Sequence, residues 1–397
     1  MEPDELGDVT TAGRQAADLS DGAAAAMEAV WLGHRLGDQG DLDGARAAFQ
    51  QAIESGHPDA APLGALGMAL VGLEQGDVNA AMAAYRQAIE SDHPYAAPIG
   101  ARDLGILLKN KGDFAGAASS YRQAIDSGHP EGAPTAANNL GNLLADLGDA
   151  DGAISAYQYA VGSGHPRAVP GAARQLGYLL QERGDPVGAS AAFQAAIDSG
   201  DLDQGPRAAE GLGYLLLTHG DLDGAQAAYQ VAIDSGHSDA AAHAWLGLGV
   251  LFNRRGDTHS EQAALRQAAD SGHTVAGPMA AVLLGMTLRR QGDVQGARSA
   301  FQRAIDSGYP AAAPDAAKEM AVLLSELGDL DGAAAACRIA IASGDADAAP
   351  RAAAILGITL AMQGDLCGAR EAYGYAAASG HPDVAPMAAE RLRELSV

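Results

Sequence analysis

The sequence predicts an all-α solenoid of about ten helix-turn-helix repeats, and three observations support this prediction. Ten Gly-Asp pairs recur at a constant interval of 36 residues, from Gly40-Asp41 to Gly364-Asp365. A constant period of this length indicates one supersecondary unit copied along the chain. Apolar residues make up 48% of the composition and aromatic residues only 5%, which suits closely packed helices rich in small residues. Within each copy, apolar positions recur at spacings of three and four, as on one face of a helix.

A trailing helix is expected after each Gly-Asp pair. In the stretch 42–53, Ala45 and Phe49 lie on one helical face, and Asp41 is a natural N-cap residue. The pair Ser55-Gly56 ends this helix, because glycine readily adopts the left-handed conformation at a helix C-terminus.

A leading helix is expected after a proline-containing turn, which begins at His57-Pro58. Proline is tolerated outside a helix or in its first turn, so Pro62 is compatible with a helix that runs to about Glu74 and ends at Gln75-Gly76. Two helices of this length are not stable alone in water, so each pair needs the next pair to cover its apolar face.

The two ends of such an array need polar caps. We predict an N-terminal capping segment over 1–22, with a helix at roughly 10–19 in register with the trailing helices. The array of ten repeats is expected over 23–386. A polar capping helix is expected over 387–397, in register with the leading helices.

The formal net charge of −25 argues against nucleic-acid binding, which needs basic patches, and against binding to an anionic membrane surface. No run approaches the length of apolar sequence that spans a bilayer, and the acidic start Met1-Glu2 does not resemble a secretory signal. The two cysteines form no disulfide framework, which favours a reducing compartment and a cytoplasmic location.

The fourth repeat carries Leu140-Gly141, Gly148-Asp149, Ala153, Tyr157, Ala160 and Pro166. This pattern resembles the tetratricopeptide repeat family, and ten copies in register make the resemblance specific. It implies a right-handed superhelix in which the aromatic residue fills the wedge between three helices. The chain departs from the family in two ways. Its period is 36 residues rather than 34. In two repeats the aromatic residue is replaced, by Leu265 and by Cys337. The longer turn could change the pitch of the superhelix.

A row of histidines occupies one turn position in most repeats. Its members are His57, His93, His129, His165, His237, His273 and His381. A metal needs ligands that converge, whereas one residue per repeat is spread along the solenoid. We therefore interpret the row as turn residues near a helix C-terminus, where a partial positive charge is favoured. The same position holds Asp201, Tyr309 and Asp345, which also suits a turn.

No motif of catalysis is found. The Gly-Asp turns do not continue into the Gly-Lys-Ser/Thr of a phosphate loop, and neither a His-Glu-x-x-His motif nor a nucleophile elbow is present. Cys337 occupies the wedge position and is expected to pack, and Cys367 is expected near a helix start. The sequence predicts a protein that is not an enzyme and that needs no metal or cofactor.

The resemblance implies that the leading helices line a concave face and that their outward positions contact ligand. Carried over to this chain, these positions are Arg102, Asp103, Asn138, Asn139, Asn142, Arg174, Gln175, Tyr178, Arg207, Glu210 and Tyr214. Amides, guanidinium groups and tyrosines can bind peptide backbone and carboxylate. Nearer the ends the same rows are apolar, as in Leu66, Leu70, Val282, Leu283, Met286, Ile355 and Ile358. The alternative is that these positions only face solvent or pack between helices.

We therefore expect a non-catalytic binding module that holds an extended peptide or a protein partner, with Asn139, Asn142 and Arg174 central to recognition. A second hypothesis is a sequestration or immunity protein that encloses a small, peptide-like metabolite, favoured by Tyr178 and Tyr214. A third is an acidic DNA mimic, which would need a continuous stripe of carboxylates. A fourth is a self-associating scaffold. The identity of the partner and the oligomeric state do not follow from the sequence.

Overall fold

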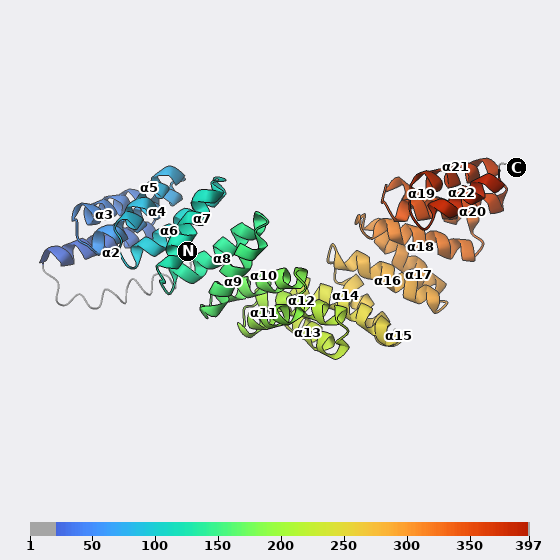
Figure 1. The fold of residues 1–397 in the computed structure, drawn as a ribbon, viewed down its shortest axis with the longest axis horizontal. Coiled ribbons are helices and arrows are strands. Elements are labelled where there is room, and N and C mark those ends of the chain that lie inside the picture. The colour runs from blue at the N-terminus through green and yellow to red at the C-terminus, as the bar shows by residue number, and fades with distance from the viewer. Residues whose placement is uncertain (1–20, 396–397) are drawn as a thin grey trace. The chain divides into compact units, whose positions relative to one another are not determined.

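The structure, a computed structural model, describes residues 21–395 of the 397-residue chain. All regular secondary structure in this range is α-helical and forms 21 helices, α2 to α22. Leading and trailing helices alternate in ten hairpins, and α22 follows the tenth (Figure 1). The predicted all-α solenoid of ten helical hairpins is therefore confirmed, whereas its handedness and pitch stay predictions. None of these helices combines the length and the hydrophobicity needed to cross a bilayer.

Tertiary contacts divide the chain into two compact units, and the division falls between Ser199 and Gly200. Five hairpins belong to the first unit, and in each of them the even-numbered helix leads. Their helices are α2 (Asp21–Asp38), α3 (Leu42–Glu54), α4 (Ala60–Glu74), α5 (Val78–Glu90), α6 (Ala96–Asn110), α7 (Phe114–Asp126), α8 (Gly132–Asp146), α9 (Ala150–Gly162), α10 (Val169–Glu182) and α11 (Pro186–Asp198).

The second unit contains the other five hairpins and the final helix. Its helices are α12 (Gln204–Thr218), α13 (Leu222–Asp234), α14 (Ser238–Arg255), α15 (Thr258–Asp270), α16 (Ala276–Arg290), α17 (Val294–Asp306), α18 (Ala313–Glu326), α19 (Leu330–Ala342), α20 (Ala348–Gln363), α21 (Leu366–Ala378) and α22 (Ala385–Glu394). Within each unit, a helix packs against its hairpin partner and against the next hairpin, so the core runs along the repeats.

The Gly-Asp turn is built in the same way in all ten hairpins. Each glycine has a φ between +73° and +86°, a left-handed conformation that a side chain would strain. The Oδ1 atom of each aspartate then accepts a hydrogen bond, 2.9–3.1 Å long, from the backbone N–H three residues later. The predicted N-cap role of Asp41 and its equivalents is confirmed, and such a cap is worth about 1 kcal/mol.

The aromatic residue of each trailing helix is buried in the wedge between hairpins. These rings are only 0–3% exposed in the eight repeats that carry one. Seven of these rings lie against the glycine of a Leu-Gly pair, and a Cβ atom at Gly141 would come within 2.5 Å of Cε1 of Tyr157. At these seven positions the ring takes the space of a side chain, whereas the repeat of Tyr85 carries the buried Ala69 at the position of the glycine.

The turn that joins each trailing helix to the next leading helix begins with serine and reads Ser-Gly-His-Pro at 55–58. The Ser55 hydroxyl donates to the carbonyl of Ala52 (2.6 Å) and accepts from the N–H of His57 (3.1 Å). Nδ1 of His57 accepts from the N–H groups of Asp59 (3.2 Å) and Ala60 (3.3 Å). The prediction that the histidines are turn residues is confirmed. The prediction that they lie at a helix C-terminus is wrong, because their side chains bond to the start of the leading helix. The imidazole caps the N-terminus of the leading helix, where Nδ1 accepts from N–H groups that have no partner within the helix.

Aspartate replaces histidine at this position in two repeats and forms the same cap. Oδ1 of Asp201 accepts from the N–H groups of Asp203 (3.0 Å) and Gln204 (2.7 Å). Asp345 accepts from Asp347 and Ala348 at the same distances. Histidine and aspartate therefore serve the same cap, because each places a hydrogen-bond acceptor at this position.

At the C-terminal end, α22 packs on α21, with Ala388 fully buried and Met387 and Leu392 against the core. Its polar face carries Arg391 and Glu394, which form an ion pair of 2.9 Å. A capping role for 387–397 stays a prediction. The N-terminal cap expected over 1–22 lies outside the described residues, apart from the first residues of α2.

Candidate functional site

Three neighbouring leading helices, α6, α8 and α10, carry eight of the eleven residues predicted to bind ligand. α6 contacts α8, and α8 contacts α10. We define the α6–α10 face by these eight residues, all of them half-buried: Arg102 and Asp103 on α6, Asn138, Asn139 and Asn142 on α8, and Arg174, Gln175 and Tyr178 on α10. The structure therefore brings the predicted central residues together within one unit.

On α6, the side chains of Arg102 and Asp103 form an ion pair, with Nε 2.7 Å from Oδ1. Burial raises the pKa of Tyr121 to about 12, and the negative charge of Asp103 adds to the rise. Burial also lowers the pKa of His129, with a further contribution from Arg102 that opposes the effect of Glu131. The pair on α6 is thus part of a charged network that reaches the wedge ring and the turn of the following repeat.

The three amides of α8 lie in the middle of the face. Oδ1 of Asn142 accepts a hydrogen bond of 2.7 Å from the hydroxyl of Tyr157, which orients the amide from beneath. Oδ1 of Asn138 is buried and has no hydrogen-bond partner among the residues that the structure describes. A Cβ atom at Gly171 of α10 would lie 3.9 Å from this amide, so the absence of a side chain there leaves space beside it.

On α10, the guanidinium carbon of Arg174 lies 5.8 Å from the centre of the Tyr178 ring, within the range of a cation–π contact. The Tyr178 ring makes an edge-on contact with Phe193, with ring centres 5.0 Å apart. Burial raises the pKa of Tyr157, and the positive charge of Arg174 acts against this rise. An aromatic ring and a guanidinium group therefore border the amides of α8.

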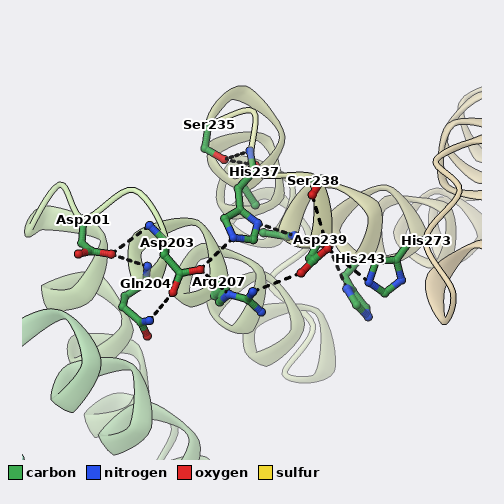
Figure 2. Close-up of polar contacts among 12 residues, drawn as sticks. Asp201, Asp203, Gln204, Arg207, Ser235, His237, Ser238, Asp239, His243 and His273 are labelled. Carbon is green, nitrogen blue, oxygen red and sulfur yellow. Dashed lines mark hydrogen bonds and ion pairs between the residues drawn. The ribbon is translucent and has the colours of Figure 1, made fainter. Parts of the chain in front are cut away.

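Arg207, Glu210 and Tyr214 belong to α12 in the second unit and form a separate set. Arg207 lies between two carboxylates, with Nε 3.0 Å from Asp203 and Nη2 3.2 Å from Asp239 (Figure 2). Nε2 of His237 lies 3.0 Å from the same Oδ1 atom of Asp203. The hydrogen bonds from Arg207 and then from His237 lower the pKa of Asp203. Arg207 thus joins successive repeats as well as facing outward.

The same network continues to the next leading helix. The rings of His243 and His273 make an edge-on contact at 4.6 Å, and Nε2 of His273 lies 3.8 Å from Asp239 (Figure 2). Burial lowers the pKa of His273, His243 lowers it further, and Asp239 opposes both. In residues 21–395 no group of three or more His, Cys, Asp or Glu side chains is arranged to hold a metal ion.

Further along α12, Tyr214 is 51% exposed and belongs to the same repeat position as Tyr178. Burial raises the pKa of Tyr229, and the negative charge of Glu210 adds to the rise. Glu210 therefore raises the pKa of Tyr229 in the way that Asp103 raises the pKa of Tyr121, and each of these tyrosines is the wedge ring of the same repeat.

A second polar cluster, in the seventh repeat, was missed in the sequence. The carboxylate of Glu261 on α15 is buried and is bonded by Asn253, Thr287 and Arg290. The sequence did contain a signal for this cluster, because Glu261 replaces the alanine found at the same position of the other nine repeats. The partners could not be recognised, because they lie 8 to 29 residues away on α14 and α16.

Repeated helical hairpins and an aromatic wedge in most repeats define a helical-repeat protein. The tetratricopeptide repeat family model matches residues 32–97, 102–173, 174–240, 212–271, 259–317 and 318–385. The chain therefore belongs to the tetratricopeptide repeat family, as the resemblance implied, and it is a protein-interaction scaffold.

Comparison with curated proteins finds no match. Among solved structures, the chain is similar to a tetratricopeptide repeat protein from Parabacteroides merdae, at 19% identity and a TM-score of 0.39 over 62% of this chain and 92% of that one. It is also similar to YrrB, described as a TPR protein with an unusual peptide-binding site, at 21% identity and a TM-score of 0.39 over 48% and 95%. The C-terminal part of a repeat protein from Cytophaga hutchinsonii matches at 15% identity and a TM-score of 0.47 over 62% and 97%.

Proposed function

We propose that the α6–α10 face binds an extended peptide, or an extended segment of a protein partner, without chemical change to it. The observation that carries this proposal is the buried Oδ1 of Asn138, which lacks a hydrogen-bond partner among residues 21–395. A buried acceptor without a partner costs about 1–3 kcal/mol. A backbone N–H group of a bound peptide would supply the missing donor.

The surroundings of Asn138 suit a peptide backbone. Asn139 and Asn142 lie on the same helix, and an amide side chain can both donate to a carbonyl and accept from an N–H group. The side chain that Gly171 lacks would otherwise stand 3.9 Å from the Asn138 amide, so a chain can approach from the side of α10. Three amides on one helix match the repeated donors and acceptors of an extended chain.

The edge of the face suits a side chain or a carboxylate. Arg174 and Tyr178 combine a guanidinium group with a rigid aromatic surface, a pairing that is enriched where binding energy is concentrated. The edge-on contact with Phe193 holds the tyrosine ring in place before any ligand arrives. Such preorganisation limits the ordering entropy lost on binding.

The proposal is tested by selecting dodecapeptides from a displayed random library against the full chain. The dissociation constant of a selected peptide is then measured by fluorescence anisotropy. We expect Asn138→Ala and Arg174→Ala each to weaken binding on the order of tenfold, which corresponds to the loss of one or two good hydrogen bonds. Mass spectrometry of the peptide after incubation should show it intact.

Arg122→Ala is the matched control, because it removes the same charge from the exposed surface of the trailing helix α7. It should leave the dissociation constant within a factor of about two. Selected peptides that bind Asn138→Ala and Arg174→Ala as tightly as the native chain would show that the α6–α10 face is not the binding site.

A further inference from the structure

Glu261, in the second unit, occupies a repeat position that is alanine in the other nine repeats. The equivalent residues of the other nine repeats are fully buried: Ala45, Ala81, Ala117, Ala153, Ala189, Ala225, Ala297, Ala333 and Ala369. Glu261 is itself only 4% exposed. A carboxylate at this depth needs strong hydrogen bonds to offset the loss of hydration.

The hydrogen bonds to Glu261 are all made to one oxygen. Oε1 accepts from Nδ2 of Asn253 (2.9 Å), from the hydroxyl of Thr287 (2.6 Å) and from Nη2 of Arg290 (3.0 Å). Oε2 accepts no hydrogen bond from the residues that the structure describes. Oε2 of this buried carboxylate is therefore available to accept a hydrogen bond from a ligand.

A cavity of about 210 Å³ adjoins this residue and is bordered by Glu261 together with Leu265, Leu283 and Met286. Leu265 occupies the wedge position that is aromatic in eight of the other nine repeats, and its smaller side chain leaves room there. Val250 and Met286 line the cavity from the same repeat position as Asn142 and Tyr178. The cavity therefore borders the leading-helix face and has about the size of one long side chain.

The charges around the cavity favour a cation. Arg289 lines the cavity but is paired with Glu319 (3.4 Å) and Glu326 (3.0 Å). Arg290 also lines the cavity and pairs with Glu261, but its side chain is 57% exposed and well screened, whereas that of Glu261 is only 5% exposed. An anion in the cavity would meet a buried carboxylate, and the chain carries a formal net charge of −25.

We propose that this cavity binds an alkylammonium group, with the ammonium on Oε2 of Glu261 and the alkyl stem against Val250, Leu265 and Met286. A charged donor on a charged acceptor makes a stronger bond than a neutral donor would. A free primary amine and a lysine side chain present the same group, since the lysine stem has four carbons. This site does not depend on the α6–α10 face, so either proposal can fail alone.

The experiment follows the methyl resonances of the nine methionines in the full chain labelled with ¹³C-methyl methionine. Met286→Leu assigns the methyl group that lines the cavity. Titration with n-butylammonium should shift the Met286 resonance along a saturable curve. Equal concentrations of n-butanol and n-butyrate should shift it at least about fivefold less, because they lack the charged donor.

Two variants test the carboxylate and the cavity. Glu261→Gln removes the charge while keeping the shape, and should weaken butylammonium binding on the order of tenfold. The double variant Glu261→Ala with Leu265→Tyr restores the pattern of the preceding repeat, Ala225 and Tyr229. It should fold, melt no lower than the native chain, and show no shift at Met286, because the ring fills the cavity.

A second pair of probes distinguishes the two sources of the group. The pentapeptide Gly-Gly-Lys-Gly-Gly binding more tightly than butylammonium, with its norleucine analogue inactive, would assign the site to lysine side chains. Tighter binding of the free amine would assign it to small amines. No shift at Met286 with any ammonium probe, equal shifts with butanol or butyrate, or binding retained in the double variant would overturn the proposal.

Discussion

Nε2 of His165 lies 2.7 Å from Oε2 of Glu131, so one hydrogen bond joins the turns that precede two successive leading helices, α10 and α8. Nδ1 of the same ring accepts from the N–H of Arg167 in the turn that precedes α10. The same pairing recurs in His93–Asp59 (3.4 Å), His237–Asp203 (3.0 Å) and His381–Asp347 (2.9 Å). These histidines therefore tie the start of one leading helix to the repeat before it.

The first prediction concerns this link. His165→Ala removes both the cap and the bond to Glu131, and His165 is only 7% exposed. We expect the free energy of unfolding, measured by urea denaturation, to fall by about 1–3 kcal/mol. A double-mutant cycle with Glu131→Ala separates the pair from the cap, because only the pair contributes to the coupling energy. A coupling energy of zero would show that the histidine acts as a cap alone.

The second prediction is a loss of stability in mild acid. Burial lowers the pKa of His129 and of His273 from the ordinary value of 6.5. The folded chain thus favours the neutral rings, whose contribution is fully present above the unfolded pKa and is lost as the pH falls through the folded pKa. The midpoint of urea unfolding should decline as the pH falls below about 6.5, and His129→Gln should reduce that decline. A midpoint that is constant down to about pH 5 would contradict this assignment.

At lower pH a second loss is expected from the carboxylates. The hydrogen bonds from Arg207 and His237 lower the pKa of Asp203, and the hydrogen bond from His381 is the main cause of the lowered pKa of Asp347. Their contributions are present above the ordinary value of 3.8 and are lost as the pH falls through the lowered pKa values. Replacing both residues with asparagine should flatten this second decline in the urea midpoint.

The third prediction distinguishes the two thiols. Cys337 is fully buried in the wedge, and burial raises its pKa to about 12, whereas Cys367 is exposed. A thiol that is both protonated and covered reacts slowly. Dithionitrobenzoate at about pH 8 should therefore modify one thiol in the native chain and both in urea. Cys367→Ser should abolish the native reaction, and rapid modification of Cys337 in that variant would contradict the buried wedge.

The fourth prediction compares two glycines of the tenth repeat. A Cβ atom at Gly357 would come within 2.6 Å of Cε1 of Tyr373, whereas nothing lies within 4 Å of one at Gly374. Gly357→Ala should destabilise the chain by about 1–3 kcal/mol, because the ring must move. Gly374→Ala lies within α21 and should stabilise it by up to about 1 kcal/mol, because alanine favours the helix. Equal effects in thermal denaturation would show that the ring does not require the glycine.

The fifth prediction links the wedge to the α6–α10 face. Tyr157→Phe removes only the hydroxyl that holds the Asn142 amide at 2.7 Å, and phenylalanine already occupies this position as Phe193 in the next repeat. The chain should lose about 1 kcal/mol of stability. Under the proposed function, a selected peptide should also bind several-fold more weakly, because the amide is no longer oriented. Unchanged affinity would mean that Asn142 does not contact the peptide.

The local signals of this chain were sufficient for the helices and their ends. Asp41 is followed by an apolar pattern of period 3.6 and then by Gly56, and these residues act through atoms only a few positions away. Because the period is 36 residues throughout, the helix bounds inferred for one hairpin apply to all ten. The fold class and most helix bounds were therefore predictable.

The sequence by itself therefore determined the hairpin and its repetition. The tertiary structure alone decided which helix end each histidine serves, where the two compact units divide, and which side chains reach Glu261. These depend on distances between hairpins, across 26 residues for Thr287 and 34 for His165 and Glu131. A local pattern specifies the conformation of a segment, whereas the hydrogen bonds of a buried group are set by whatever the neighbouring repeat places beside it.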